Sequence, residues 1–141
     1  MFLRTTIVIL YGLFLSGCVS WYDSVASMSS EELKKVDDLK LCSSYFYRNE
    51  EKVAAEITRR NLINNEGWKS VRHRKIIPGM SRCAVYAVLG SPRIETRKAI
   101  DGQNTLEIIS FSTVPGSSDP SYRSPIRTHI RLTNGVVTNI E

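Results

Sequence analysis

The stretch IIPGMSRCAVYAVLGSP, from Ile76 to Pro92, decides the fold of this 141-residue chain. Ser81 is a favourable N-cap, because its hydroxyl can accept a hydrogen bond from a backbone N–H of the first helical turn. Gly90 suits the left-handed position that ends many helices, and Pro92 cannot continue one. Between these signals, apolar residues recur at helical spacing and define one buried face: Ala84, Val85, Val88 and Leu89. The stretch predicts a short, buried helix.

After this helix the pattern changes from helical spacing to strand-forming runs. Residues 93–100 and 105–113 flank Asp101-Gly102, a dipeptide that favours a tight hairpin turn. Residues 114–124 are rich in proline, glycine and serine, which predicts a long loop.

The C-terminal residues predict two more strands. Residues 126–132 alternate, and residues 136–140 are separated from them by the turn Thr133-Asn134-Gly135. The alternation predicts one buried and one basic face, made respectively of Ile126, Thr128, Ile130, Leu132 and of Arg127, His129, Arg131. We therefore expect a small antiparallel sheet of three to four strands.

The residues before the central helix predict further helices. Ser29 and Glu32 have the spacing of a capping box. From Leu33 to Phe46 apolar residues recur every three or four positions, which indicates one buried helical face. These residues form either one helix or two, with Asp37 or Asp38 starting the second.

Residues 50–60 predict another amphipathic helix, with acids early and bases late as the helix dipole favours. Residues 61–67 then predict a loop. Helices that precede antiparallel strands indicate an α+β fold with the helices on one face of the sheet. We expect a helical extension over residues 31–67 and an α+β domain over residues 68–141.

The N-terminus has the organisation of an export signal. Arg4 precedes an apolar stretch over residues 5–15, which is shorter than the roughly 20 residues that span a bilayer. The following Leu15-Ser16-Gly17-Cys18 resembles a bacterial lipobox, which implies cleavage after residue 17 and acylation of Cys18. The alternatives are an ordinary signal peptide or a buried strand with a chance cysteine. Val19, in place of aspartate, favours the outer membrane by analogy with Gram-negative lipoproteins.

Residues 18–30 are small and polar apart from Trp21 and Tyr22, and they predict a lipidated tether. The two aromatic residues are of the type that lies at lipid headgroups, or they are incidental.

Beyond Cys18, the chain has two cysteines, Cys42 and Cys83. An even number of cysteines in an oxidising compartment suggests a disulfide, and two separate buried thiols are the alternative. The cysteines and histidines show no spacing typical of a zinc site, so we expect no metal.

The net charge of +5 is compatible with nucleic acid binding, but the export signal argues against it and favours an anionic membrane surface. The sequence contains no serine-hydrolase elbow, zinc-protease motif or paired-acid motif. His73 and His129 lie among basic residues, and we expect both to be surface histidines. We therefore expect no catalytic residue, no cofactor and no enzymatic activity.

Ile76 to Pro92, together with the terminal HIRLTNGVVTNIE (His129 to Glu141), resembles the SmpA/OmlA (BamE-like) family of outer-membrane lipoproteins. This resemblance implies two helices on a three-stranded sheet, similar to the repeat unit of β-lactamase inhibitor protein. It also implies structural roles for the matching motif residues, which are Gly79, Met80, Ser81, Val85, Leu89, Gly90 and Pro92. The helices expected before residue 68 are additional, and Ile108-Ile109-Ser110-Phe111 stands where the family has two aromatic residues, so the chain resembles a divergent member.

Two segments are candidates for contacts. Lys69, Arg72, Arg74 and Lys75 form the densest basic run, which either binds anionic lipid or is a solvated helix face and turn. The 114–124 loop, together with the unpaired strand edge of a small open sheet, is the expected protein-contact surface. In the loop, Tyr122 and Arg123 are residue types enriched in protein interfaces, and the alternative is an unengaged loop.

These observations predict a periplasm-facing, outer-membrane lipoprotein that docks envelope proteins. The family resemblance implies the β-barrel assembly machinery as partner. The alternatives are an inhibitor or immunity-like module that occludes a periplasmic enzyme, and a structural envelope lipoprotein.

Overall fold

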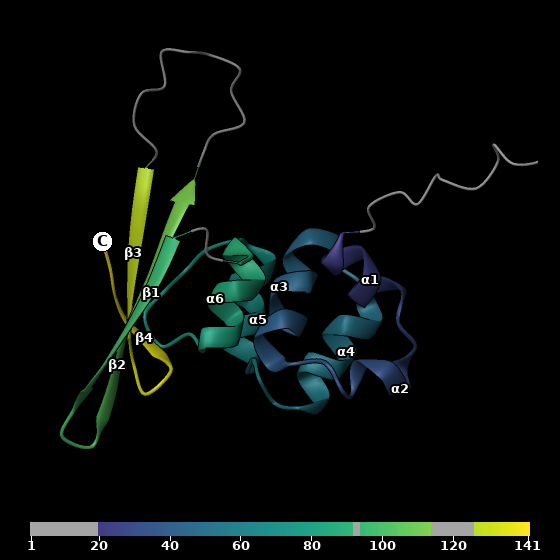
Figure 1. Cartoon of the computed structure of the whole chain (residues 1–141), viewed down its shortest axis with the longest axis horizontal. Helices are drawn as coiled ribbons and strands as arrows, with labels where there is room; N and C mark the ends of the chain where they lie inside the picture. Colours follow the sequence, from purple (N-terminus) through teal and green to yellow (C-terminus); the bar gives the residue numbers. More distant parts are fainter. Residues whose placement is uncertain (1–19, 92–93, 114–125) are drawn as a thin grey trace, which may run out of the picture.

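The computed structural model describes residues 20–91, 94–113 and 126–141. Within these ranges it contains six helices and four strands (Figure 1). The helices are α1 (Trp21–Ser27), α2 (Ser30–Leu33), α3 (Asp38–Arg48), α4 (Glu51–Arg59), α5 (Asn65–Arg72) and α6 (Arg82–Leu89). The strands are β1 (Ile94–Asp101), β2 (Asn104–Thr113), β3 (Ile126–Thr133) and β4 (Val136–Ile140). The expected α+β class is confirmed.

The four strands form one antiparallel sheet in the order β1-β2-β3-β4. The chain that leads into α6 covers the outer edge of β4. There the Gly79 backbone N–H donates to the Val137 carbonyl at 2.8 Å, and the Val137 N–H donates to the Met80 carbonyl at 2.9 Å. Among the described residues, the opposite edge strand, β1, pairs only with β2.

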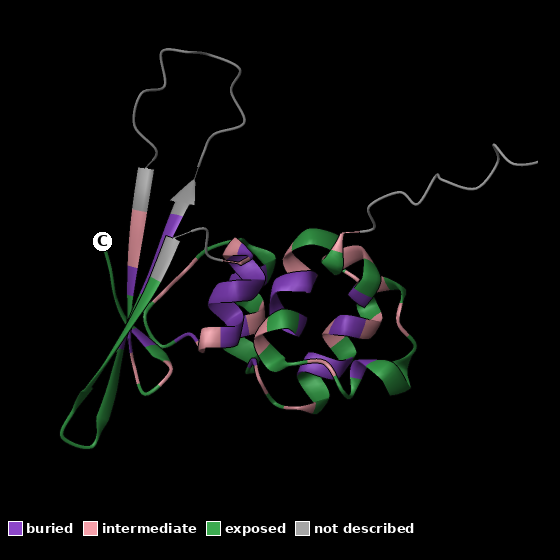
Figure 2. Ribbon diagram, in the orientation of Figure 1, coloured by how far each residue is buried: buried purple, intermediate pink, exposed green. Residues whose placement is uncertain are grey.

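Helix α6 lies against the inner face of the sheet. Ile109 and Ile130 are fully buried on that face, and the rings of Tyr86 and Phe111 meet edge to face at 6.2 Å. Helix α3 packs on α6, and α1 and α4 pack on the far side of α3 (Figure 1). Buried residues accordingly gather in α6, α3 and the middle of the sheet (Figure 2).

The two interpretations of residues 33–46 are resolved in favour of two helices. The capping box of Ser29 and Glu32 is confirmed at α2. Asp37 then caps α3, and its carboxylate accepts hydrogen bonds from the N–H groups of Leu39 at 3.0 Å and Lys40 at 3.2 Å.

Helix α6 begins at Ser81 as expected, since the Ser81 hydroxyl accepts a hydrogen bond from the Ala84 N–H at 3.2 Å. The end of the helix differs in detail from the expectation. Gly90 has φ +77° and ψ −158°, so its φ is positive but its ψ is extended instead of left-handed helical. Only glycine adopts this backbone region without strain.

One helix is unexpected and another begins earlier than expected. Helix α1 occupies the segment expected to be a tether, and its Val25 is fully buried. Helix α5 begins in the predicted 61–67 loop, so the expected boundary between residues 67 and 68 falls inside a helix. Each has few buried apolar side chains, too few to produce a helical periodicity in the sequence.

Arg60 ties α4 to the segment after α2. Its guanidinium donates to the carbonyl oxygens of Leu33 at 2.7 Å and Val36 at 2.8 Å. It also forms ion pairs with Asp38 at 2.6 Å and with Glu56 at 2.8 Å, and only 15% of its side chain is exposed. One cation therefore pairs with the last carbonyl of α2, a carbonyl of the following segment and two carboxylates.

This arrangement predicts a pH dependence of stability. Hydrogen bonds from Arg59 and then Arg60 lower the pKa of Glu56 from 4.5 to about 2. Because the folded pKa lies below the unfolded value, the stabilisation is complete above pH 4.5 and disappears as the pH falls towards 2. We expect Glu56 to account for at most about 3 kcal/mol of the acid-induced loss in unfolding free energy.

Urea denaturation at a series of pH values checks this expectation. Glu56→Gln should flatten the dependence between pH 4.5 and 2, whereas Glu51→Gln, on the exposed side of the same helix, should retain it. An unchanged slope in Glu56→Gln would contradict the assignment.

Candidate functional site

The outer face of the sheet, which we define as the face turned away from α6, carries both apolar and charged side chains. Glu107, Ile109 and Phe111 point inward and are buried, so their neighbours Leu106 and Ile108 point outward and are 38% and 36% exposed. The strand register places Ile108 beside Arg131 and Ser110 beside His129. This face therefore combines apolar contact area with polar groups, as protein-binding surfaces do.

Two side-chain pairs organise the outer face. The Ser110 hydroxyl and His129 Nδ1 are 2.8 Å apart, and Ser110 is only 8% exposed. An Arg131 guanidinium nitrogen lies 3.0 Å from Glu141 Oε1. His129 is thus half-buried and hydrogen-bonded, in contrast to the surface histidine expected from sequence.

The Ser110–His129 pair contains a nucleophile and a base. A serine hydrolase needs in addition an acid that orients the histidine and donors for the oxyanion. The carboxylate of Glu141, the residue that follows β4, forms an ion pair with Arg131 and accepts a hydrogen bond from the Asn139 amide at 2.8 Å. The arrangement that the structure gives is a hydrogen-bonded cross-strand pair, and the absence of catalysis stays a prediction.

The β1–β2 hairpin extends beyond the helical layer and is exposed at its tip (Figures 1 and 2). Ile100, next to the tip, is 83% exposed and is the most exposed large apolar residue in the described part of the chain. Residues 96–100 of the edge strand β1 are all exposed. An exposed edge strand offers unpaired backbone groups to a strand of another protein.

The four basic residues expected to contact anionic lipid lie on α5 and the turn that follows it, and all four are exposed. Lys69 forms an ion pair with Glu66 at 2.7 Å, and Arg72 Nε donates to the Trp68 carbonyl at 3.3 Å. Arg74 lies over the ring of Phe46, with its guanidinium carbon 5.3 Å from the ring centroid. Lys75 completes the group. Contact of these four residues with anionic lipid stays a prediction.

A surface hollow of about 290 Å³ lies between α3 and the end of α5. It is lined by Tyr45, Phe46, Asn49, Val71, Arg72, Arg74 and Ala87. Two arginines on an aromatic wall suit an anionic group, and this hollow brings Arg72 and Arg74 together without Lys69 or Lys75.

The structure joins Cys42 on α3 to Cys83 on α6 by a disulfide, with the two Cα atoms 5.4 Å apart. Cys42 is fully buried and Cys83 is 6% exposed. The bridge therefore links α3 covalently to α6, the helix that packs on the sheet.

The motif residues occupy structural positions. Gly79 has φ +90° at the turn before α6, where a side chain would be strained. Met80 and Val85 are buried, with 2% and 0% exposure, and Leu89 is half-buried. Ser81, besides capping α6, donates from its hydroxyl to the Leu62 carbonyl at 2.7 Å. Four predicted site residues, Cys18, Pro92, Tyr122 and Arg123, lie outside the described residues.

Sequence analysis did not single out the hairpin tip or the outer-face pairs. The alternation in residues 126–132 correctly assigned buried Ile130 and Leu132 and exposed Arg131. Finding Ser110 beside His129 requires the register of β2 and β3, which the sequence does not state.

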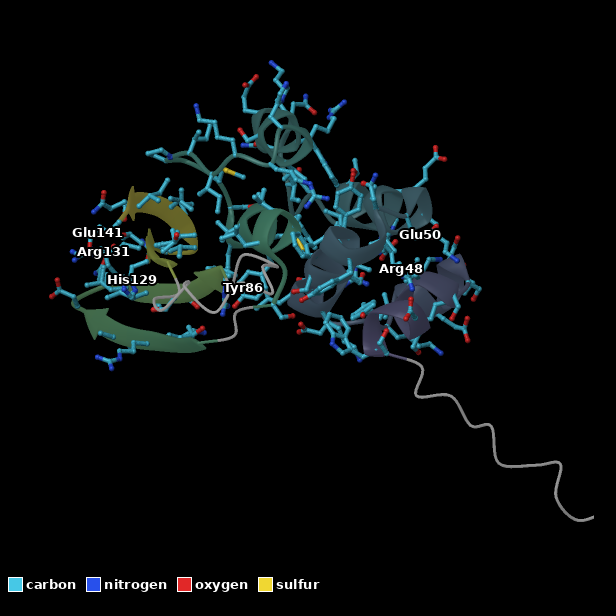
Figure 3. All side chains as sticks on the ribbon, turned by 90° about the horizontal axis from the view of Figure 1, so that it is seen from above. Arg48, Glu50, Tyr86, His129, Arg131 and Glu141 are labelled. Carbon is cyan, nitrogen blue, oxygen red and sulfur yellow. A yellow bond between two sulfur atoms is a disulfide. The ribbon has the colours of Figure 1, made fainter. Side chains whose placement is uncertain are left out.

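The outer-face residues lie far from the helical end of the molecule. His129, Arg131 and Glu141 group at one end, whereas Arg48 of α3 lies at the other (Figure 3). The helices of residues 20–91 lack the length and the hydropathy of a membrane-spanning segment. Within the described residues, no group of three His, Cys, Asp or Glu side chains could hold a metal ion.

Comparison with models of protein families, with curated proteins and with solved structures finds no match to this chain.

Proposed function

We propose that the chain is a non-catalytic lipoprotein, anchored in the outer membrane through acylated Cys18, that docks a periplasmic envelope protein on its sheet. The lipobox-like segment from Leu15 to Cys18 supports the anchor, because several acyl chains bind a bilayer stably where one does not. The Cys42–Cys83 disulfide supports an exported protein, since such bonds persist in oxidising compartments.

The observation that carries the docking role is the projecting β1–β2 hairpin with its exposed Ile100. A partner strand added to β1 would pair its backbone groups, and Ile100 would supply an apolar anchor. For residues 68–141 we further propose the SmpA/OmlA (BamE-like) fold, on the basis of the Ile76–Pro92 motif. The partner that this family implies is a subunit of the β-barrel assembly machinery.

The anchor is tested separately from the docking. Mass spectrometry of the mature N-terminal peptide should find acyl chains on Cys18, and Cys18→Ala should move the protein from the membrane fraction to the soluble envelope fraction. An unmodified Cys18, or unchanged fractionation of the variant, would remove the anchor.

For docking, we expect Ile100→Asp to reduce partner recovery from cross-linked envelopes at least tenfold, because it places a charge in an apolar contact. Its thermal stability should be unchanged, because Ile100 is exposed. Val136→Asp is the matched control, since Val136 is 42% exposed but lies on the covered edge of the sheet. Equal recovery with both variants would contradict docking through the hairpin.

The identity of the captured protein separates the candidate functions. Subunits of the assembly machinery would support the family-based partner. A single hydrolase would replace it by the inhibitor role, and the absence of any protein partner would leave a structural lipoprotein.

A further inference from the structure

Four aromatic side chains from α1 and the C-terminal end of α3 form a continuous cluster beside the end of α6. We define the aromatic cluster as Trp21, Tyr22, Phe46 and Tyr47. Tyr22 stacks on Tyr47 with centroids 4.5 Å apart, and Trp21 meets Tyr47 edge to face at 6.0 Å. Phe46 extends the cluster, at 4.9 Å from Tyr47. The rings that face outward are Trp21 and Tyr47, which are 37% and 38% exposed.

Cations surround this cluster. Lys40 Nζ lies 6.0 Å from the centroid of the Trp21 ring, and the Arg48 guanidinium lies 5.8 Å from that of Tyr22. Arg48 also forms an ion pair with Asp23, so one acid accompanies these two bases. Exposed tryptophan and tyrosine beside lysine and arginine are typical of surfaces that lie at the headgroup level of a bilayer.

An open hollow of about 290 Å³ adjoins Trp21. Its walls are mainly apolar, with Lys40 among the lining residues, which also include Leu39, Ser43, Tyr86 and Ser91. A hollow of this chemistry suits the junction between a lipid headgroup and its acyl chains, where apolar and charged groups meet.

The position of the cluster in the chain decides its surroundings. The first described residue is Ser20, and Trp21 is the third residue after Cys18. Three residues span at most about 11 Å even when fully extended. The headgroup region on one side of a bilayer is itself roughly 6 Å thick. If Cys18 is acylated, the backbone of Trp21 can lie at most about 5 Å beyond the headgroup region, so its ring stays within reach of the headgroups.

We propose that the aromatic cluster, together with Lys40 and Arg48, docks on the anionic phospholipid headgroups of the leaflet that holds Cys18. This inference rests on the proposed acylation. It deepens the proposed function by fixing an orientation. With α1 and the C-terminal end of α3 on the membrane, the tip of the β1–β2 hairpin, which lies on the opposite side of the molecule from α1, points into the periplasm (Figure 1).

Tryptophan fluorescence tests the contact, because the chain has two tryptophans in different places. The mature chain is coupled through the Cys18 thiol to a maleimide lipid in vesicles of phosphatidylglycerol and phosphatidylcholine in equal parts. Trp68→Phe leaves Trp21 as reporter, and Trp21→Phe leaves Trp68 on α5 as the matched control. Lipids brominated near the headgroup end of the acyl chains should quench Trp21 strongly and Trp68 little. Equal quenching of the two reporters, or none of Trp21, would overturn the proposal.

The charges are tested without the anchor. In binding of the uncoupled Cys18→Ser chain to the same vesicles, Lys40→Glu should weaken the affinity roughly twentyfold, because it replaces one attractive charge by a repulsive one. Lys98→Glu, the same change on exposed β1, should have little effect. Equal effects of the two reversals would contradict a localised surface, and binding to peptidoglycan sacculi without vesicle binding would replace the lipid by a glycan.

These results are separable from the anchor test. Mass spectrometry of the natural protein reports whether Cys18 is acylated, whereas the coupled chain reports whether the aromatic cluster enters the headgroup region once the chain is tethered there.

Discussion

Gly90→Ala is expected to lower the free energy of unfolding by about 4 kcal/mol, one of the two largest effects that we foresee for a local change. Two costs add. The backbone at φ +77° and ψ −158° is strained for any residue with a side chain. In addition, the new Cβ would lie 2.8 Å from Phe46 Cδ1 and 3.1 Å from the Tyr47 hydroxyl, so these two rings would have to shift.

Gly79→Ala separates these two costs. Gly79 also has positive φ, at +90°, but a Cβ there would meet nothing within 4 Å. We expect a loss of about 1–2 kcal/mol from backbone strain alone. Chemical denaturation of both variants measures the difference, and equal losses would show that the contact with Phe46 and Tyr47 does not matter.

The Gly90 variant also bears on the aromatic cluster, because Phe46 and Tyr47 belong to it. If the new methyl group displaces these rings, the fluorescence of nearby Trp21 should change before the protein unfolds. The fold and the proposed membrane surface thus share one tightly packed contact.

The elements that sequence reasoning predicted well carry their signals locally. Helix α6 has its N-cap, its apolar face and its terminating glycine within ten residues, and the structure places all three as expected apart from the ψ angle of Gly90. The β1–β2 hairpin forms as expected between two strand-forming runs, although its turn is one residue later than predicted, at Gly102 and Gln103, because Asp101 pairs with Asn104.

The elements that it missed depend on contacts between distant residues. Tyr22 forms part of helix α1 and stacks on Tyr47, and nothing near Tyr22 in the sequence shows that partner. Arg60 binds carbonyls 24 and 27 residues away, at the end of a helix whose position only the tertiary fold sets.

The candidate site shows the same division. The apolar character of Ile100 and Ile108 is visible in the sequence, but their exposure depends on the tertiary structure. Ile100 lies near the hairpin tip, beyond the helical layer, and Ile108 lies on the face turned away from α6. The Ser110–His129 pair depends on the register between β2 and β3, and a one-residue shift would turn every side chain of one strand to the other face.

Replacing Cys42 and Cys83 together by serine is expected to lower the free energy of unfolding by about 4 kcal/mol, because the bridge closes a loop between residues 41 positions apart. For a chain of this size such a loss corresponds to roughly 15 °C in melting temperature. Calorimetry of the serine pair, and of the Cys18→Ser chain with and without reductant, measures it. The reduced chain and the serine pair should melt together, because both lack the same constraint.

The single variants Cys42→Ser and Cys83→Ser provide the control, since each also opens the loop and should lose nearly as much stability as the pair. The bridge joins α3, which carries half of the aromatic cluster, to α6, which carries the sheet. Without the bridge, the position of the proposed membrane surface relative to the proposed docking face should be less fixed. The residues that form each surface are unchanged. Two results together would show that the bond does not form. Reductant would leave the melting temperature of the Cys18→Ser chain unchanged, and two thiols would be alkylated when the unreduced chain is unfolded.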